Sequence, residues 1–153
     1  MSQSIIASHR LRSGRFSQPG RTYLLTTTVQ RREPLFRAFA LGRLVAAELR
    51  AAHEQGRVCS LAWVVMPDHL HWLVTLEGHS LDAVMRQIKS NSARRINRQL
   101  GRAGALWQDG YHDRALRKDA DLQAAARYIV ANPLRAGLVE RVGDYPLWDA
   151  IWL

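Results

Sequence analysis

The sequence predicts an α+β fold in which helices pack on one antiparallel sheet. Two observations carry this prediction. Several short segments are rich in β-branched and aromatic residues or alternate apolar with polar ones, whereas longer segments repeat apolar residues at helical spacing. These segments follow the order strand, helix, strand, strand, helix, strand, and one more helix comes after them. The length of 153 residues suits one hydrophobic core, so we expect a single domain.

Three strands and one helix are expected in the first half of the chain. Thr22–Val29 is rich in Thr, Leu, Tyr and Val, which predicts a strand. Apolar residues at helical spacing predict a helix from about Leu35 to Glu54, ended by Gly56. Val58–Met66 predicts the second strand. The following Pro67-Asp68 pair is a turn signal, so the next strand returns as the second arm of a hairpin.

The second half begins with a long helix capped by Ser80. Its buried stripe consists of Leu81, Val84, Met85, Ile88, Ile96 and Leu100. Glycines between residues 101 and 104 end this helix, and Tyr111–Arg117 predicts a fourth strand.

A third helix is expected to be capped by Asp119 or Asp121 and to end near Ala131, because Pro133 disfavours helical backbone at the residue before it. The tail, residues 138–153, holds Trp148 and Trp152 and is expected to pack back on the domain.

This order of elements is the split βαβ, or ferredoxin-like, arrangement. We expect an antiparallel sheet with helices on one face, and an additional C-terminal helix that carries Tyr128. Residues 1–20 are polar and basic and predict a flexible arm. Residues 21–153 then form the single domain.

Two histidines separated by one leucine begin the return strand. Because successive side chains of a strand point to opposite faces, His69 and His71 share one face. Leu70, Trp72, Val74 and Leu76 share the other, which the helices cover, so the histidine face is expected to remain open for a ligand. Two neighbouring imidazoles can hold a divalent cation. The same spacing also fits two half-exposed surface histidines, so the pattern alone leaves both interpretations open.

Tyr128 lies about 100° from Ile129 around the third helix, beside its apolar stripe, and Asn132 follows about one turn later. A tyrosine in a chain with paired histidines suggests a nucleophile beside a metal site. A phenol of ordinary pKa near ~10 needs a base or positive charge nearby to react at neutral pH. In isolation, Tyr128 also fits an amphipathic residue at the core edge, and Asn132 fits a helix cap.

The charge of the chain is strongly positive. Lysine and arginine total 22 against 13 acidic residues, a formal net charge of +9, and all but two of these cations are arginine. Residues 1–32 and 86–102 contain no acidic residue, which favours nucleic acid as a partner over a membrane surface. The candidate DNA contacts are Arg12, Arg15, Arg94, Arg95 and Arg98. A GC-rich coding sequence or a solvated helix face would give the same arginines without any such role.

Cys59 is the single cysteine, so the chain has no internal disulfide and no cysteine-based zinc cluster. No apolar run approaches the ~20 residues of a membrane span, and no signal-type segment is evident. We therefore expect a cytoplasmic protein without membrane association.

Three blocks of sequence carry a resemblance to a known family. They are Val64–His71 (VVMPDHLH), Trp107–His112 (WQDGYH) and Tyr128–Gly137 (YIVANPLRAG), in that order along the chain. In these blocks the chain resembles the REP-associated tyrosine transposases, which are single-tyrosine members of the HUH nuclease superfamily.

The resemblance implies that His69 and His71 bind Mg²⁺ or Mn²⁺, with Asn132 as a third polar ligand. It also implies that Tyr128 attacks a phosphate of single-stranded DNA beside a palindromic hairpin. The products would be a 5′-phosphotyrosine link and a free 3′-hydroxyl. Whether the protein is a monomer or a homodimer, and whether its tyrosine acts in cis or in trans, stays open at this point.

Two other functions compete with this one. The first is a non-catalytic nucleic-acid-binding regulator on a ferredoxin-like sheet, although such sheets stack bases on aromatic residues where this one presents histidines. The second is a metal-dependent hydrolase without a covalent step.

Overall fold

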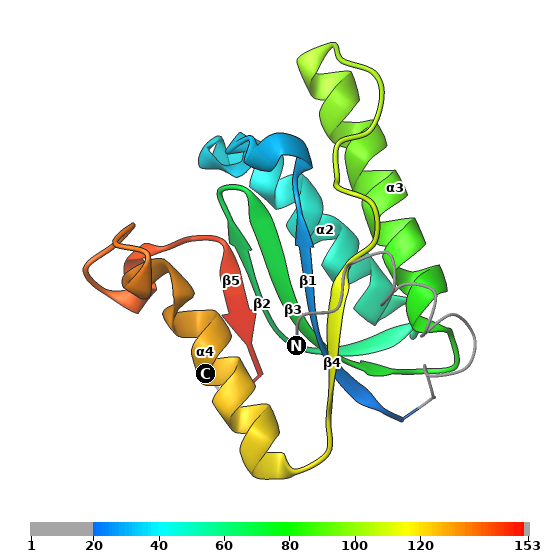
Figure 1. The fold of residues 1–153 in the computed structure, drawn as a ribbon, viewed down its shortest axis with the longest axis vertical. Coiled ribbons are helices and arrows are strands. Elements are labelled where there is room, and N and C mark those ends of the chain that lie inside the picture. The colour runs from blue at the N-terminus through cyan, green and yellow to red at the C-terminus, as the bar shows by residue number, and fades with distance from the viewer. Residues whose placement is uncertain (1–19, 152–153) are drawn as a thin grey trace.

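Five strands and three α-helices, with three short 3₁₀ helices, make up residues 20–151, the part of the chain that this computed structural model describes (Figure 1). The strands are β1 (Thr22–Thr28), β2 (Val58–Met66), β3 (His69–Leu76), β4 (His112–Leu116) and β5 (Trp148–Ala150). The α-helices are α2 (Phe39–Glu54), α3 (Leu81–Leu100) and α4 (Asp119–Arg135), and the 3₁₀ helices are η1 (Gln30–Arg32), η2 (Leu35–Arg37) and η3 (Val142–Asp144). The predicted basic arm, with Arg12 and Arg15, lies outside the described residues except for Gly20.

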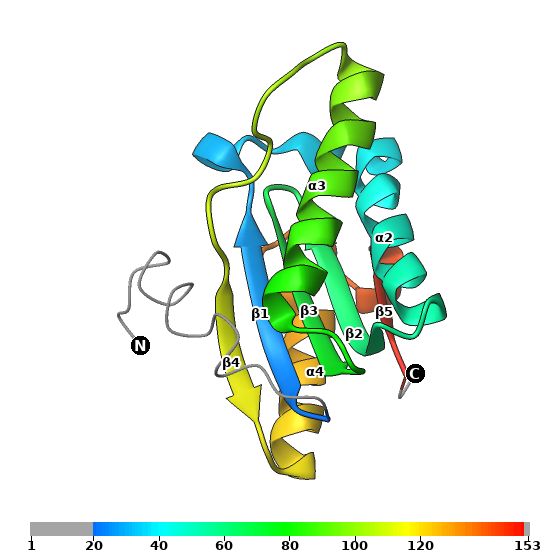
Figure 2. The ribbon, with the colours of Figure 1, turned by 90° about the vertical axis from the view of Figure 1, so that its right-hand side faces the viewer.

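The strands form one antiparallel sheet in the order β4-β1-β3-β2-β5. Its first four strands have the order of the split βαβ arrangement, so the predicted fold is confirmed. Helices α2 and α3 cover one face of the sheet, and α4 lies on the other (Figure 2). Among residues 20–151, no helix has both the length and the apolar composition needed to cross a bilayer.

The two faces of β3 are both covered. Leu70, Trp72, Val74 and Leu76 are buried on the face toward α2 and α3, as predicted. The opposite face, which bears the histidines, was predicted to be open for a ligand. That prediction is wrong in part, because the face is not fully open. Leu73 is completely buried there and His71 is only 8% exposed, because the apolar stripe of α4 packs across β2 and β3.

The caps at both ends of α3 agree with the sequence, whereas Leu100, predicted in its buried stripe, is 39% exposed. The Ser80 hydroxyl accepts a hydrogen bond from the Ala83 amide at 3.1 Å, which is the capping interaction expected of serine at this position. Gly101 ends the helix with φ of +68°, a conformation that glycine adopts without steric cost.

Helix α4 differs from the prediction at both ends. It begins at Asp119 after Lys118, without a side-chain cap, so Asp119 and Asp121 lie in the first turn, where their charges favour the helix dipole. It continues past Ala131 to Arg135 with Pro133 inside. Pro133 falls in the last turn, and its carbonyl accepts the Leu138 amide at 3.0 Å. Gly137, with φ of +74°, completes this Schellman motif.

The C-terminal segment covers the free edge of β2. Val64 pairs with Trp148 in β5, which confirms that this part of the tail packs back, whereas Trp152 lies outside the described residues. The Val65 amide donates to the Leu147 carbonyl at 2.9 Å, and the buried Tyr145 hydroxyl donates to the Val65 carbonyl at 2.6 Å. Strand β5 itself is not predicted by the sequence, because three residues are too few to show an alternating pattern.

We expect Tyr145→Phe to lower the free energy of unfolding by about 1 kcal/mol, because the buried Val65 carbonyl loses its hydroxyl partner. Urea unfolding followed by circular dichroism measures this. Burial raises the pKa of Tyr145 to about 12, whereas the unfolded phenol ionises near ~10. The stability difference between the two proteins should therefore shrink as the pH rises from 10 to 12. Tyr128→Phe, which alters a half-exposed phenol, is the control, and equal unfolding midpoints for Tyr145→Phe and wild type would contradict the assignment.

Candidate active site

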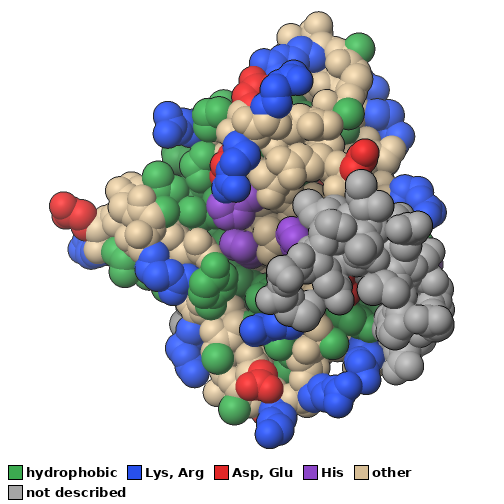
Figure 3. All heavy atoms as spheres, viewed as in Figure 1, with side chains coloured by type: hydrophobic (Ala, Val, Ile, Leu, Met, Phe, Trp, Pro, Cys, Tyr) green, Lys and Arg blue, Asp and Glu red, His purple; other side chains and the backbone are tan. Residues whose placement is uncertain are grey.

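The two histidines of β3 lie side by side on the sheet face that α4 partly covers. Their ring centroids are 4.8 Å apart, and the ring planes are inclined by 80°. In Figure 3 histidine side chains reach the surface in the middle of this face, with lysine and arginine side chains around them. The strand geometry therefore brings the two rings together as the sequence predicts.

Each imidazole is held through its Nδ1 atom. The His69 Nδ1 is 2.7 Å from Asp68 Oδ1, and the His71 Nδ1 is 2.8 Å from Thr26 Oγ1. When Nδ1 carries the proton and donates it in these bonds, Nε2 of each ring keeps its lone pair. Neither Nε2 has a hydrogen-bond partner among residues 20–151. Metal-binding histidines in proteins have this arrangement.

The charges around the rings favour neutral imidazole at His71. Its burial, with smaller contributions from His69 and the positive charge of Arg135, lowers the pKa of His71 to about 4. A neutral imidazole is the form that binds a metal. Burial also acts to raise the pKa of Asp68, but the hydrogen bonds from His69 and Arg32 outweigh it and the pKa is lowered overall. Asp68 is thus an ionised acceptor for His69.

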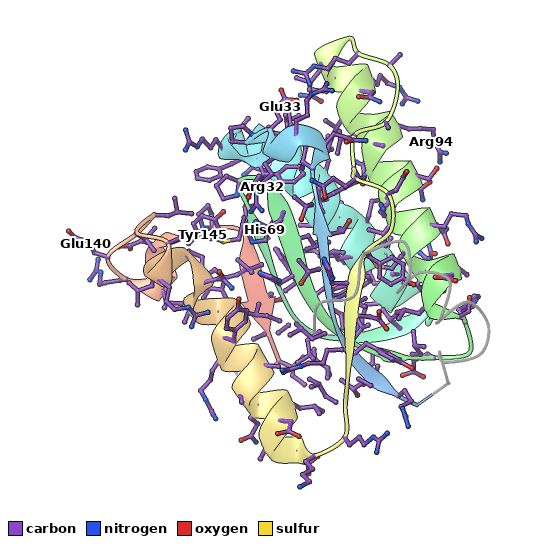
Figure 4. The ribbon with its side chains drawn as sticks, viewed as in Figure 1. Arg32, Glu33, His69, Arg94, Glu140 and Tyr145 are labelled. Atoms are coloured by element: carbon purple, nitrogen blue, oxygen red, sulfur yellow. The ribbon has the colours of Figure 1, made fainter. Side chains whose placement is uncertain are left out.

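A strained segment holds Asp68 from the other side. Arg31 and Arg32 in η1 have φ of 56° and 54°, the left-handed region that non-glycine residues rarely adopt. Arg32 Nε donates to Asp68 Oδ2 at 2.9 Å, above His69 in Figure 4. The next residue, Glu33, accepts two hydrogen bonds from Arg102 at 2.9 and 2.8 Å. Arg102, which follows α3, is thereby connected to the histidine pair through hydrogen bonds of this segment.

Tyr128 projects from α4 toward the histidines. Its ring centroid lies 5.6 Å from that of His71, and its side chain is 44% exposed. Ala125 and Ile129 on the same helix are buried, so Tyr128 lies at the edge of the apolar stripe, as predicted. The structure thus brings a half-exposed phenol together with two largely buried imidazoles.

Arg135 and Asn132 follow Tyr128 on the same side of α4, two turns and one turn later. The Arg135 guanidinium lies 4.3 Å over the Tyr128 ring and donates to the Tyr128 carbonyl at 2.9 Å. Asn132 Nδ2 donates to the same carbonyl over a long 3.5 Å. The amide oxygen of Asn132 is free of hydrogen bonds within the described part of the chain. Its role as a ligand stays a prediction.

The arginines predicted on α3 do not gather at this site. Helix α3 covers the opposite face of the sheet, and Arg94 projects from it away from His69 (Figure 4). Arg95 forms an ion pair with Glu48 at 3.0 Å, and Arg94 hydrogen-bonds to Ser90 and Asn91 on its own helix. Arg98 is exposed. Their contact with DNA stays a prediction.

Sequence reasoning missed four residues around the site. Asp68 precedes His69 directly, yet its position suggested only a turn. Arg135 lies seven residues after Tyr128, a helical spacing that could have indicated it. Thr26 and Arg32 could not be found without the strand pairing that places Thr26 opposite His71.

A search for similar proteins identifies transposases. The family described as "Transposase IS200 like" matches residues 19–132, a range that includes both histidines and Tyr128. The REP-associated tyrosine transposase of Escherichia coli K12 is 34% identical over 88 residues, which is 56% of this chain and 50% of the relative. A putative REP-associated tyrosine transposase of Haemophilus influenzae is 30% identical over 116 residues, 65% of each chain. The chain thus spans between half and two thirds of these relatives.

Two solved structures resemble this one. A REP-associated tyrosine transposase bound to a REP hairpin has a TM-score of 0.72 at 26% identity, covering 88% of this chain and 79% of that one. A putative transposase from Deinococcus radiodurans has a TM-score of 0.51 at 23% identity, covering 71% and 87%. At 23% identity, the similarity to the second structure shows a shared fold only.

We expect His71 in chelator-treated protein to titrate with a pKa of about 4, measured by NMR of the imidazole nitrogens. Tyr128→Ala should move this pKa toward the ordinary value, because burial is the main cause of the shift and the phenol ring covers His71. Arg127→Ala, on another side of α4, should leave it unchanged. An unaltered His71 pKa in Tyr128→Ala would show that this ring does not shield the imidazole.

Proposed function

This chain belongs to the IS200-like transposase family, and on that premise we propose that it cleaves and rejoins single-stranded DNA through Tyr128. The observation that carries the proposal is the contact between the Tyr128 ring and His71, 5.6 Å between centroids, beside a second imidazole whose Nε2 has no hydrogen-bond partner in the described part of the chain. A nucleophile and two potential metal ligands thus meet at one exposed place.

The proposed step exchanges one ester for another. The Tyr128 oxygen attacks phosphorus and loses its proton, while the bond from phosphorus to the 3′-oxygen breaks and that oxygen takes a proton. The DNA then carries a free 3′-hydroxyl, and its 5′-phosphate is esterified to the protein. Attack by a 3′-hydroxyl reverses the step. Because an ester replaces an ester, rejoining needs no ATP.

The residues present fit a divalent cation. His69 and His71 would hold it through Nε2, since their Nδ1 atoms are occupied and His71 is neutral. When bound, the cation would polarise the scissile phosphate and stabilise the charge that develops on its oxygens. Two imidazoles suit Mn²⁺, whereas Mg²⁺ prefers oxygen ligands, for which Asn132 offers an amide oxygen. Among the described residues, no cluster of three or more His, Cys, Asp or Glu could hold a metal.

The other residues of the site position these groups. Asp68 and Thr26 fix the orientation of the two rings, and Arg32 fixes Asp68. Arg135 packs over the phenol and places a positive charge where an approaching phosphate is attracted. Tyr128 meets His71 of its own chain, which supports catalysis in cis by a monomer or by each subunit of a homodimer.

The proposed substrate is single-stranded DNA with a palindromic hairpin. The solved relative with 26% identity is bound to a REP hairpin, and the net charge of +9 favours a polyanion. Arg12, Arg15, Arg94, Arg95 and Arg98 remain the candidates for hairpin contacts away from the site.

We expect Tyr128→Phe to abolish the covalent DNA adduct while hairpin binding stays within about twofold of wild type, because only the nucleophilic oxygen is lost. Oligonucleotides labelled at the 3′ end keep the label on the protein-linked fragment, which a denaturing gel retards. Binding is measured by fluorescence anisotropy, and Tyr145→Phe is the control that should still form the adduct.

Each other result of this assay has a definite meaning. An adduct formed by Tyr128→Phe would exclude Tyr128 as the nucleophile. Cleavage by wild type without an adduct would indicate the hydrolase, and binding without cleavage would indicate the regulator.

We expect the double substitution of His69 and His71 by alanine to remove Mn²⁺-dependent cleavage. Asp68→Ala should weaken Mn²⁺ binding by about 10-fold or more, because His69 loses the partner that orients it. Electron paramagnetic resonance of free Mn²⁺ gives the affinity independently of activity. Asp109→Ala, an exposed aspartate elsewhere, should bind as wild type does. Unchanged affinity in the double variant would place the metal at another site.

A further inference from the structure

A pocket of about 360 Å³ opens beside Tyr128, between α4 and strands β1 and β4. Leu24, Thr26 and Arg114 line it from the sheet, and Ala124, Ala125 and Tyr128 line it from α4. His71 also reaches it, so the pocket is continuous with the active site. Its volume falls within the range of small-ligand sites, about 300–1,000 Å³.

The strand register explains why an arginine stands at this pocket. Leu24 pairs with Leu73 on one side and with Arg114 on the other, and residues directly opposite each other share a face. Arg114 therefore projects on the face that bears His71, at the outer edge of the sheet. It is exposed and has no ion-pair partner within residues 20–151.

The pocket combines apolar walls with this exposed cation. Leu24, Ala124 and Ala125 offer hydrocarbon surface, and the small alanines leave room between α4 and the sheet. A flat nucleobase matches such walls, and a phosphate matches a guanidinium at the rim.

The groove on the other side of α4 also has apolar walls and an arginine, Arg127, but it lies away from the active site. It has about 590 Å³ and is lined largely by apolar residues, including Ala126, Val130 and Val142. It reaches neither His71 nor Tyr128. Single-stranded DNA that crosses the active site would therefore reach the pocket beside β4, and not the groove on the other side of α4.

We propose that this pocket binds one unpaired nucleotide next to the scissile phosphate, with its base between Leu24 and α4 and its phosphate on Arg114. The proposal rests on the proposed function, and it names the part of the DNA that the site holds. One nucleotide fixed here would set which phosphodiester lies at Tyr128. Arg114 thereby becomes a positioning residue for the cleavage point.

The test measures binding in the Tyr128→Phe background, so that no cleavage occurs. The probes are fluorescent oligonucleotides that carry a hairpin and an unpaired flank, each with one flank nucleotide replaced by an abasic linker. We expect one abasic position to weaken binding by about tenfold. Arg114→Ala should weaken binding of the intact flank by about tenfold and reduce the log-log salt slope by about 0.7, the value for one phosphate on a single strand. Arg114→Lys should restore the slope.

Ala124→Phe fills the pocket from an exposed helix position. It should weaken binding of the intact flank and make binding insensitive to the critical abasic position, so that the two changes are not additive. Arg127→Ala, which removes an arginine from the groove on the other side of α4, is the matched control and should act as wild type. A hairpin without a flank should bind equally to all of these proteins.

The outcomes separate this proposal from the proposed function. The pocket assignment is wrong and the function stands under one set of results: wild type forms the adduct, but adding Arg114→Ala or Ala124→Phe to the Tyr128→Phe variant changes the binding of no flank. If wild type neither binds DNA nor forms an adduct, the proposed function is wrong and the pocket assignment is wrong with it.

Discussion

The antiparallel register of β1 against β3 is the constraint on which the rest of the site depends. It sets Thr26 opposite His71 and Thr28 opposite His69. A slip of one residue would exchange the faces of β3, burying two imidazoles under α2 and α3 and placing leucine and tryptophan on the face that α4 only partly covers. The four large apolar residues of the helix-covered face make that slip unfavourable. Packing on one face of the sheet therefore fixes the chemistry on the other.

Helix α4 adds the second requirement, because it must cover apolar sheet surface and still leave a reactive phenol accessible. It does so by burying Ala125, Ala126 and Ile129 and leaving Tyr128 at the margin of this contact. The length of the helix matters as much as its orientation. Had it ended near Ala131, Arg135 would not lie over the Tyr128 ring. The capping motif at Gly137 thus contributes to the site from beyond the helix.

Local signals in the sequence were sufficient for most of the fold. Strand β2 and helix α3 have the predicted bounds, since a run of β-formers and a serine cap are recognisable without tertiary context. Strand β5 was not predicted, because its pairing depends on the open edge of β2. An amphipathic stripe shows that α4 packs, but not on which face of a sheet. His69, His71 and Tyr128 were identified from sequence, whereas Thr26 and Arg32 join the site only through contacts between distant segments.

The paired left-handed residues of η1 also bear on how this protein tolerates change. Backbone of this kind costs roughly 1–2 kcal/mol for a non-glycine residue. Glycine would relieve that cost at either position, but the two arginines are not equivalent. Arg32 is bonded to Asp68, whereas Arg31 has no hydrogen bond or ion pair with the described residues. Glycine at Arg31 would therefore relieve strain without breaking a hydrogen bond, although it would remove a charge that acts on Glu33. Glycine at Arg32 would relieve the same strain but remove the contact with Asp68, which orients His69.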